Sequence, residues 1–393
     1  MSVLTIGDIG VLSDMIHIGD EAMFEAARDE LAARGLDVVG ISSAPGESAA
    51  RYGVPSVPRL GFVGLDRAAA ARRSSLLVHV AEGRAALEAG DPATAALDAL
   101  GEASGVLIAG GGNLASRWPV HVYERTTLAA MARVRDLPVV VSGQTFGPDL
   151  DDADAERVAA MARAAALTGV REHASAQLAR RWGAQVHAGV DDASFLGGGP
   201  TELDGPRASD RVLVSLSGWF AGRSVDEVEQ GIAALLDHAA DTVGSVVFHA
   251  HFGPEPAGTA PAGDAALHER VRARMRRPSD VVPSGDSLTA ARLARTSRLL
   301  VTSRYHPAVF AAPAGVPILA LAADEYTRIK LTGALAHWGQ DGVLDLDDLT
   351  DAPQRLSAIA ATAAAATRSA AERIHRHRTD AARWWDTVAD ALR

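Results

Sequence analysis

Several side chains that could do chemistry follow one short apolar stretch near the end of the chain. The stretch is Leu299–Thr302, and Ser303, Arg304 and His306 come directly after it. Pro307 follows, and since proline suits the first helical position, we expect it to open a helix whose free N–H groups face the same place. A guanidinium, an imidazole and a helix amino end can together hold a small, multiply charged anion and move a proton onto or off it.

A second strand and helix are predicted immediately downstream. The apolar stretch 316–321 leads to Tyr326, Arg328 and Lys330. On its own pattern Lys330 is best interpreted as a solvated helix residue. If it lies on the same face as the preceding group, however, an ammonium joins the guanidinium and the imidazole in one anion site.

Three apolar stretches in the first half of the chain are predicted strands, and each is expected to end in a loop of glycine and polar residues. Ligands of parallel sheets bind at the carboxyl ends of the strands, so this edge is the expected ligand site. The glycines would let backbone approach a ligand closely, although a tight turn would need them too. The stretches are 105–109 before GGGN (110–113), 139–142 before GQTFGP (143–148), and 168–170 before Arg171.

The buried charges have competing interpretations. Arg171 follows a buried strand, where an unpaired guanidinium would be costly, so we expect it to meet an anion. That anion is either a substrate or a carboxylate such as Glu172 or Asp191. Arg304 has the same two choices, a substrate phosphate or an interdomain salt bridge. His306 could merely cap its helix or bond a carbonyl, but the neighbouring Arg304 favours a chemical role.

Two pairs of residues resemble metal ligands. His249 and His251 are spaced to share one face of a strand. Asp191 and Asp192 are adjacent carboxylates without an evident third ligand. Neither pair makes a convincing coordination set, so we predict no metal.

A β–loop–α–β unit opens the chain and implies a parallel sheet. Its strands are expected at 3–6 and 36–41, with a helix at 21–34 that Gly35 ends. Strand patterns resume at 212–216 and 245–249. The predicted class is α/β, with two Rossmann-like domains facing a cleft that holds the active site (a GT-B-like architecture) and a long C-terminal helix.

The Gly- and Pro-rich stretch 197–210 is the predicted interdomain linker. From about residue 351 the pattern is continuously helical, and we interpret its Trp384–Trp385 pair as helix packing, with a homodimer contact as the alternative. The predicted domains are an N-terminal α/β domain at 1–197, a C-terminal α/β domain at 210–350, and a helix at 351–393 that packs back.

Composition excludes several classes of protein. The 393-residue chain has a formal net charge of −11, which argues against a nucleic-acid partner. It has no cysteine, so disulfides, thiolate metal sites and cysteine nucleophiles are excluded. No apolar run is long enough for a membrane span, and MSVLTIGDIG does not resemble a secretory signal. We therefore expect a cytoplasmic protein with at most peripheral membrane association.

Several short motifs, in this order and at these spacings, resemble those of the polysaccharide pyruvyl transferase family. No single motif is specific, but all of them together are a strong signal, and they cover the chain from Gly19 to Lys330. The motifs are Gly19-Asp20-Glu21, Gly110-Gly111-Gly112-Asn113, Gly143-Gln144 with Gly147-Pro148, Val170-Arg171-Glu172 with Ser175, Asp191, Ser303-Arg304 with His306, and Lys330.

The resemblance implies an enzyme that takes phosphoenolpyruvate as donor and places pyruvate as a cyclic ketal across two hydroxyls of one sugar in a cell-envelope glycan. It implies His306 as general acid and Arg171 as a helper in forming an oxocarbenium-like intermediate. Lys330 would bind the donor, joined by Arg304 and Ser303, and no cofactor is implied. The acceptor would be a glycan or lipid-linked sugar. The residues expected to contact it or to line the cleft are Gly19, Asp20, Gly111, Gly112, Asn113, Gln144 and Asp191.

The chain departs from the family pattern in its N-terminal half, which is the expected acceptor side. His17 stands where the family has an asparagine two residues before Gly19, and 42–100 matches nothing in the family. One alternative is a GT-B glycosyltransferase using a nucleotide sugar, for which Asp324 or Glu325 is the nearest ribose-binding candidate. Another is a non-catalytic sugar-binding relative, which the presence of all three proposed reactive side chains disfavours.

Overall fold

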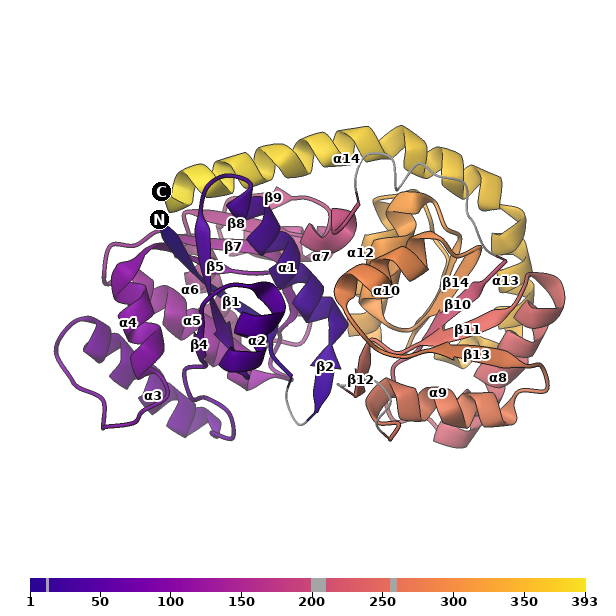
Figure 1. Cartoon of the computed structure of the whole chain (residues 1–393), viewed down its shortest axis with the longest axis horizontal. Coiled ribbons are helices and arrows are strands. Elements are labelled where there is room, and N and C mark those ends of the chain that lie inside the picture. The colour runs from indigo at the N-terminus through magenta and orange to yellow at the C-terminus, as the bar shows by residue number, and fades with distance from the viewer. Residues whose placement is uncertain (12–13, 199–209, 255–259) are drawn as a thin grey trace. The chain divides into compact units, whose positions relative to one another are not determined.

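The computed structural model divides into two compact α/β units, each assembled from separate segments of the chain (Figure 1). The structure describes residues 1–11, 14–198, 210–254 and 260–393, so most of the predicted linker at 197–210 lies outside the described residues. The first unit comprises Met1–Val11, Met23–Asp192 and Thr379–Arg393, and the second comprises Leu12–Ala22 and Ala193–Arg378.

This division is more interleaved than the domains expected from the sequence. The segment Leu12–Ala22 belongs to the second unit, although it lies within the expected N-terminal domain 1–197. The end of the chain, Thr379–Arg393, belongs to the first unit. Sequence patterns locate strands and helices, but they do not show which core a short connecting segment joins.

The first unit is built on an eight-stranded parallel sheet in the order β4-β3-β1-β5-β7-β8-β9, with β6 paired to β7. Its central strands are buried on both faces, as continuous apolar runs favour. The strands are β1 (Ser2–Ile9), β3 (Asp37–Ser42), β4 (Ser56–Pro58), β5 (Ala103–Ile108), β6 (Gly111–Leu114), β7 (Val139–Phe146), β8 (Leu167–Val170) and β9 (Val186–Ala188).

Helices cover both faces of this sheet (Figure 1). One core packs α3 to α7 against it, so part of the unassigned stretch 42–100 serves as covering helices. The other core contains α1 together with Trp384 and Trp385, which are buried within the first unit and therefore pack as helix residues. The helices are α1 (Ile18–Ala32), α2 (Pro45–Tyr52), α3 (Arg67–Ala81), α4 (Thr94–Glu102), α5 (Pro119–Arg133), α6 (Asp152–Ala164) and α7 (His173–Arg181).

The second unit is built on a six-stranded parallel sheet in the order β13-β11-β10-β14-β15-β16. A separate antiparallel ribbon pairs β2 with β12. The strands are β2 (Met15–His17), β10 (Val212–Ser215), β11 (Val246–His249), β12 (Phe252–Pro254), β13 (Ser279–Val282), β14 (Leu299–Thr302), β15 (Ile318–Ala322) and β16 (Val343–Asp345).

One face of the second sheet packs on α8, α9 and α13, while α10, α11 and α12 contact one another (Figure 1). The helices are α8 (Val225–Thr242), α9 (Gly263–Arg274), α10 (Ser287–Arg295), α11 (Tyr305–Ala311), α12 (Glu325–Ala336), α13 (Ala352–Ala361) and α14 (Ala363–Leu392), with 3-10 turns at Asp192–Phe195, Ala312–Ala314 and Leu346–Asp351. The predicted α/β class with parallel sheets and a long C-terminal helix is confirmed.

Three local predictions are wrong. The glycine stretch after β5 is not a loop, because Gly111–Leu114 forms β6 and pairs with β7. The GQTFGP stretch is likewise partly strand, since β7 continues to Phe146. The C-terminal helix is interrupted at Thr362, whose φ of −91° and ψ of 8° separate α13 from α14. The glycines in the first two stretches favoured loops, but strand pairing in the sheet has the larger effect on their conformation.

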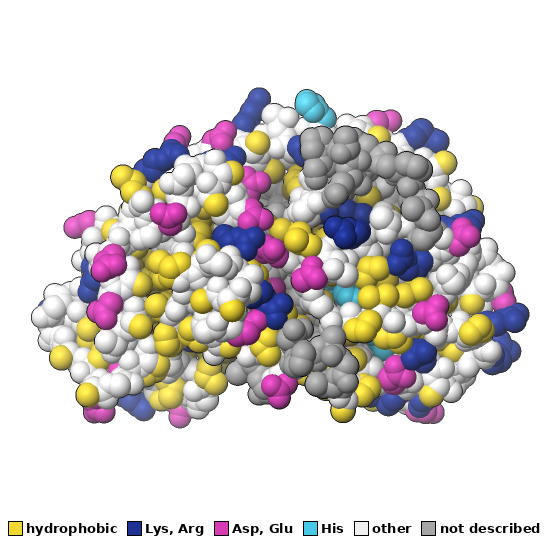
Figure 2. Space-filling view, in the orientation of Figure 1, with side chains coloured by type: hydrophobic (Ala, Val, Ile, Leu, Met, Phe, Trp, Pro, Cys, Tyr) yellow, Lys and Arg dark blue, Asp and Glu magenta, His cyan; other side chains and the backbone are white. Residues whose placement is uncertain are grey.

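No helix among the described residues combines the length and the apolar character that a membrane crossing requires. On the face drawn in Figure 2, lysine and arginine side chains are interspersed with aspartate and glutamate side chains. Such a mixed surface lacks the basic patch by which a nucleic-acid-binding face is recognised.

Candidate functional site

The end of β14 holds Ser303 and Arg304 in a fixed geometry within the second unit. The Thr302 hydroxyl accepts a hydrogen bond from Arg304 N at 2.9 Å and donates to Ser215 O at 2.8 Å. Ser303 Oγ accepts from Ser217 N at 2.8 Å. The turn is therefore attached to the last residue of neighbouring β10 and to Ser217 just after it, at the carboxyl edge of the sheet where ligands of parallel sheets bind.

The helix that follows begins earlier than the sequence predicted. Helix α11 starts at Tyr305, so Pro307 is its third residue and His306 lies inside the first turn. Proline is tolerated there because its missing N–H has no partner in the first turn. The helix has seven residues, which makes it a poor basis for the anion site predicted at its amino end.

Arg304 is held by a buried carboxylate. Its Nε lies 2.8 Å and its Nη2 2.5 Å from the two oxygens of Asp264, whose side chain is 1% exposed. Asp264 also accepts from Phe252 N at 2.9 Å. Burial raises the pKa of Asp264, and the Arg304 charge opposes that shift. The predicted salt bridge thus exists, but inside the second unit, and Nη1 of Arg304 keeps no hydrogen-bond partner among the described residues.

Lys330 lies against aromatic rings. Its Nζ donates to the Tyr326 hydroxyl at 2.8 Å and lies 4.0 Å from the centre of that ring. It lies 5.6 Å from the centre of the Tyr305 ring, so α11 and α12 meet at this lysine. Both tyrosines are buried, and Lys330 itself is half-buried. The structure therefore does not show the fully solvated helix lysine that its own sequence pattern favoured.

Two further histidines, set aside in the sequence as unconvincing metal ligands, are buried near His306. His249 ends β11 and His251 follows it, and their ring centres lie 5.3 Å apart. Among the residues that the structure describes, neither ring has a hydrogen-bond partner at either nitrogen. Burial lowers the pKa of His249 to about 4 and holds that of His251 well below its ordinary value, with His249, His306 and Arg304 adding to the latter.

His268 extends this histidine cluster. It accepts from Leu216 N at 3.0 Å, and burial lowers its pKa to about 3. No set of three or more His, Asp or Glu side chains suited to a metal ion occurs within the described ranges. The strand spacing singled out His249 and His251 in the sequence, but nothing in the sequence brings His268 or His306 to them.

In the first unit, Arg171 is buried in a network of its own. Its Nη1 donates to Asp191 Oδ2 at 2.7 Å and its Nε donates to Thr145 Oγ at 2.9 Å, while Glu172 lies 3.9 Å away. The side chains of Arg171 and Asp191 are 1% and 2% exposed. Of the two anions expected for Arg171, the structure shows the carboxylate.

The adjacent Asp192 has a different environment from Asp191. Its Oδ2 accepts from Ser142 Oγ at 2.8 Å, and Ser142 in turn accepts from Trp384 Nε1 at 3.0 Å. Burial raises the pKa of Asp192 to about 7, with the Asp191 carboxylate adding to the shift. Gly143 makes room for this carboxyl group, since a Cβ there would lie 2.4 Å from Asp192 Oδ2.

The remaining predicted residues of the first unit gather at β6 and β7. Gln144 is fully buried and donates to Ala109 O. A Cβ on Gly111 would lie 3.1 Å from Asn113 Oδ1 and 3.4 Å from Gln144 Oε1, so these amides surround the glycine. Gly112 is half-buried beside them. The structure thus brings together four of the expected acceptor residues.

Gly19 and Asp20 lie elsewhere, in the second unit. A Cβ on Gly19 would lie 2.0 Å from His306 Nδ1, so this glycine packs directly on the imidazole. Asp20 lies 3.9 Å from the ring of His17. The sequence interpretation placed these residues with the acceptor set because they occur in the N-terminal half.

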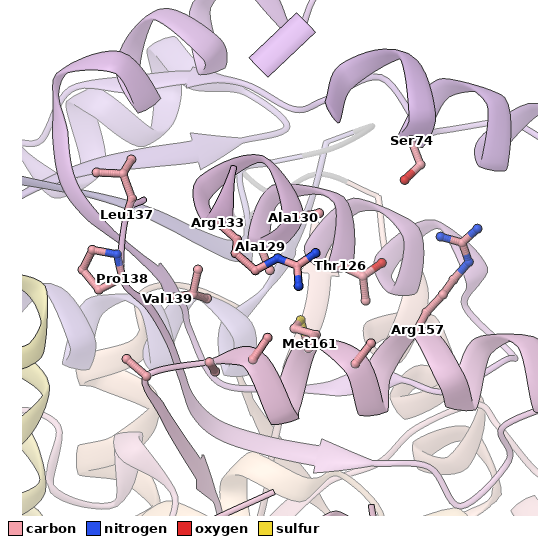
Figure 3. A pocket seen from close by; sticks show the side chains of 14 residues that line it. Ser74, Thr126, Ala129, Ala130, Arg133, Leu137, Pro138, Val139, Arg157 and Met161 are labelled. Carbon is pink, nitrogen blue, oxygen red and sulfur yellow. The ribbon is translucent and has the colours of Figure 1, made fainter. Parts of the chain in front are cut away.

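A well-formed cavity of about 300 Å³ lies in the first unit between α5 and α6 (Figure 3). It is lined by apolar side chains such as Leu137, Val139 and Met161, with Arg133 and Arg157 among them. Val139 is the first residue of β7, whereas Gly143 and Gln144 lie further along that strand. The lining of the cavity includes none of the predicted site residues.

Two of the comparisons with known proteins found matches. A family model described as polysaccharide pyruvyl transferase matches residues 17–325. No curated protein sequence matches the chain.

Solved structures show the fold. S. aureus MnaA with UDP is 12% identical, with a TM-score of 0.57, and the match covers 96% of this chain and 95% of that one. The glycotransferase of kitacinnamycin is 13% identical, with a TM-score of 0.59 and coverage of 100% and 99%. UDP-GlcNAc 2-epimerase from Neisseria meningitidis, bound to UDP-GlcNAc, is 10% identical, with a TM-score of 0.59 and coverage of 100% and 99%. These likenesses show a GT-B fold.

Proposed function

Because the chain belongs to the polysaccharide pyruvyl transferase family, we propose that it transfers pyruvate from phosphoenolpyruvate to a sugar of a cell-envelope or exopolysaccharide glycan. The product is a pyruvate ketal across two hydroxyls of that sugar, and phosphate is released. The family match over residues 17–325 carries this proposal. The side chains that the reaction would need are present in the two units.

The second unit supplies the donor-binding cations in this proposal. Phosphoenolpyruvate carries a carboxylate and a phosphate, and charge-assisted hydrogen bonds from several cations would hold it. Lys330 is restrained between Tyr305 and Tyr326. Arg304 is fixed by Asp264 through Nε and Nη2, which leaves Nη1 to contact a donor oxygen. Ser303 lies next to it on the same turn.

His306 is the proposed general acid. As one sugar hydroxyl bonds to the central carbon of the donor, His306 gives a proton to the neighbouring methylene carbon, which becomes the methyl group. Phosphate then leaves with the electron pair of its C–O bond, and the second hydroxyl closes the ketal. Of the two hydroxyl protons, one replaces the proton that His306 gave to the methyl group, and the other leaves with the phosphate.

The first unit supplies the acceptor side and Arg171. Asn113 and Gln144 present amide groups around Gly111, and amides are suited to sugar hydroxyls because they both donate and accept hydrogen bonds. Asp191 and Thr145 fix the Arg171 guanidinium. In this proposal Arg171 helps the oxocarbenium-like intermediate to form by stabilising the negative charge of the departing phosphate, and Asp191 acts through it by setting its orientation.

A nucleotide-sugar glycosyltransferase is the weaker candidate. Its ribose would need a free carboxylate, and the nearest candidates in sequence were Asp324 and Glu325. Glu325 lies 3.5 Å from Arg328 Nε. The structure shows Asp324 capping α12, with Thr327 N donating to it at 2.9 Å and Trp219 Nε1 donating at 2.8 Å. This carboxylate is therefore already engaged by the protein.

Ligand-dependent thermal stability would test the donor. Phosphoenolpyruvate at millimolar concentration should raise the melting temperature, since a ligand that binds only the folded state stabilises it by mass action, whereas UDP-GlcNAc should not. Lys330→Ala should reduce the phosphoenolpyruvate shift, and Arg368→Ala, on α14, should leave it unchanged. Stabilisation by UDP-GlcNAc alone would overturn the proposal.

Turnover is measured as phosphate released from phosphoenolpyruvate in the presence of candidate sugar acceptors. We propose no metal cofactor, because arginine, lysine and histidine can neutralise the donor. Phosphate release should therefore survive exhaustive chelation. A loss that Mg²⁺ or Mn²⁺ restores would contradict this part of the proposal.

A further inference from the structure

Gly19 lies on the imidazole of His306. An added Cβ would lie 2.0 Å from Nδ1, 2.6 Å from Cγ and 2.7 Å from Cε1 of that ring. Because Cγ is the ring atom nearest the backbone, a small rotation about the side chain cannot relieve all three contacts. The ring as a whole would have to leave its position.

The imidazole has neighbours on its other sides. The Tyr305 ring centre lies 5.2 Å away with its plane nearly perpendicular, and the Phe310 ring centre lies 6.0 Å away. Both of these side chains are buried. The position of His306 is therefore defined by two aromatic rings and by the backbone at Gly19.

The backbone at Gly19 is itself anchored, so it cannot retreat from a larger side chain without cost. Ile18 N donates to His251 O at 3.0 Å. The preceding strand β2 pairs with β12, where His17 stands opposite Phe252 and their ring centres are 4.1 Å apart. Both strands belong to the second unit, together with His306.

The conformation of Gly19 does not itself require glycine. It lies in the first turn of α1, and its φ is not in the left-handed region. Alanine is the better helix former, so Gly19→Ala would by itself favour α1. The three atoms nearest to an added Cβ all belong to the imidazole, so the imidazole is what a side chain here would meet first.

We propose that Gly19 is the positioning residue for the general acid, by which the start of α1 sets the place of His306. This rests on the proposed function, and it reassigns Gly19 from the acceptor side to the donor side. A misplacement of about 1 Å of a catalytic group can cost about 10²-fold in rate. Gly19→Ala should therefore lower turnover by about 10²-fold with little change in the Michaelis constant for phosphoenolpyruvate.

A double-mutant cycle with His306→Gln separates positioning from general damage. If Gly19 acts through His306, adding Gly19→Ala to His306→Gln should change the residual rate by less than about twofold, because coupled residues are not additive. Gly46→Ala is the matched control: this glycine also lies in a first helical turn, in α2, with open space around it. Its turnover should equal that of the wild type.

Nitrogen-15 NMR of the histidine rings tests the contact between Gly19 and His306 without a measurement of catalytic activity. The His306 signals, identified by their loss in His306→Gln, should move in Gly19→Ala and stay in place in Gly46→Ala. Unmoved signals, wild-type turnover in Gly19→Ala, or an equal loss in both backgrounds would each overturn the inference. If the wild type releases no phosphate but the signals move, the proposed function fails while the contact at Gly19 stands.

Discussion

The carboxyl edges of the two sheets differ in the kind of titratable group that they bury. In the first unit, the buried groups are mostly carboxylates: Asp191 is neutralised by Arg171, and burial raises the pKa of Asp192 to about 7. In the second unit, they are mostly imidazoles, and burial keeps His249 and His251 neutral. Burial disfavours the charged form in both cases, so it raises the pKa of an acid and lowers that of a base.

This difference suggests that the charges of the first edge mainly stabilise the fold, whereas those of the second edge can contact an anion. The first edge depends on an ion pair in which both side chains are buried, whereas Arg304, the partner of buried Asp264 at the second edge, is 27% exposed. The second edge has half-buried cationic groups, Arg304 and Lys330, restrained by neighbours and able to contact an anion. It follows that the two units should respond oppositely to pH, and that the first should be the more sensitive to losing one charge.

The largest expected effect is the loss of the buried ion pair. Arg171→Met should lower the free energy of unfolding by about 3–5 kcal/mol, since breaking a buried pair leaves an uncompensated charge. Urea unfolding at pH 7 measures it. Arg163→Met is the matched control, because Arg163 pairs with Glu156 at 2.9 Å on the surface, where pairs contribute about 0–1 kcal/mol. Equal losses in the two variants would contradict the contrast between buried and exposed pairs.

Local patterns predicted much of the second edge. The strand 299–302 was predicted at the bounds that β14 has, because its apolar run is short and bounded by polar residues. The family motifs then brought Arg304, His306 and Lys330 together. What the sequence could not supply was the partner of each group. Asp264 is separated from Arg304 by 40 positions, and no local rule links them.

The residues of the N-terminal half of the chain were harder to predict in their details. Asp191 and Asp192 are identical neighbours in sequence, yet one meets a guanidinium and the other a hydroxyl. Gly19 occurs in the N-terminal half, and only the pairing of β2 with β12 shows that it belongs with His306. Long-range packing decided these positions, whereas periodicity and turn chemistry describe neighbours in the chain.

A smaller effect is expected at Asp192. Its folded-state pKa of about 7 lies above the unfolded value of 3.8, so the folded protein binds the extra proton between these values. Stability should therefore fall as pH rises through this window, by at most about 1.4 kcal/mol per pH unit. The groups that bear on it are Asp191, Arg171, Ser142 and Glu30.

Asp192→Asn removes this titration. Urea unfolding at pH 5 and pH 8 measures the free energy of unfolding of both proteins. The value for the variant should rise relative to that of the wild type at the higher pH, because the wild-type carboxyl ionises there. Asp98→Asn, at an exposed position of α4, should show no such trend. A difference between variant and wild type that stays constant across this range would place the Asp192 titration outside it.

The smallest effect is expected at His249, where the sign is reversed. Its folded-state pKa of about 4 lies below the ordinary 6.5, so the unfolded chain binds the extra proton between these values and stability should fall as pH falls. His249→Leu removes one such group but leaves His251 and His268, whose pKa values are also lowered by burial. The variant should therefore gain on the wild type from pH 6.5 towards pH 4.5, which is the mirror image of Asp192→Asn. His375→Leu, at an exposed position of α14, should run parallel to the wild type in the same urea series. If the free energy of unfolding of His249→Leu also changes with pH as that of the wild type does, burial does not keep the His249 imidazole neutral. The two edges would then not differ in pH response at this residue.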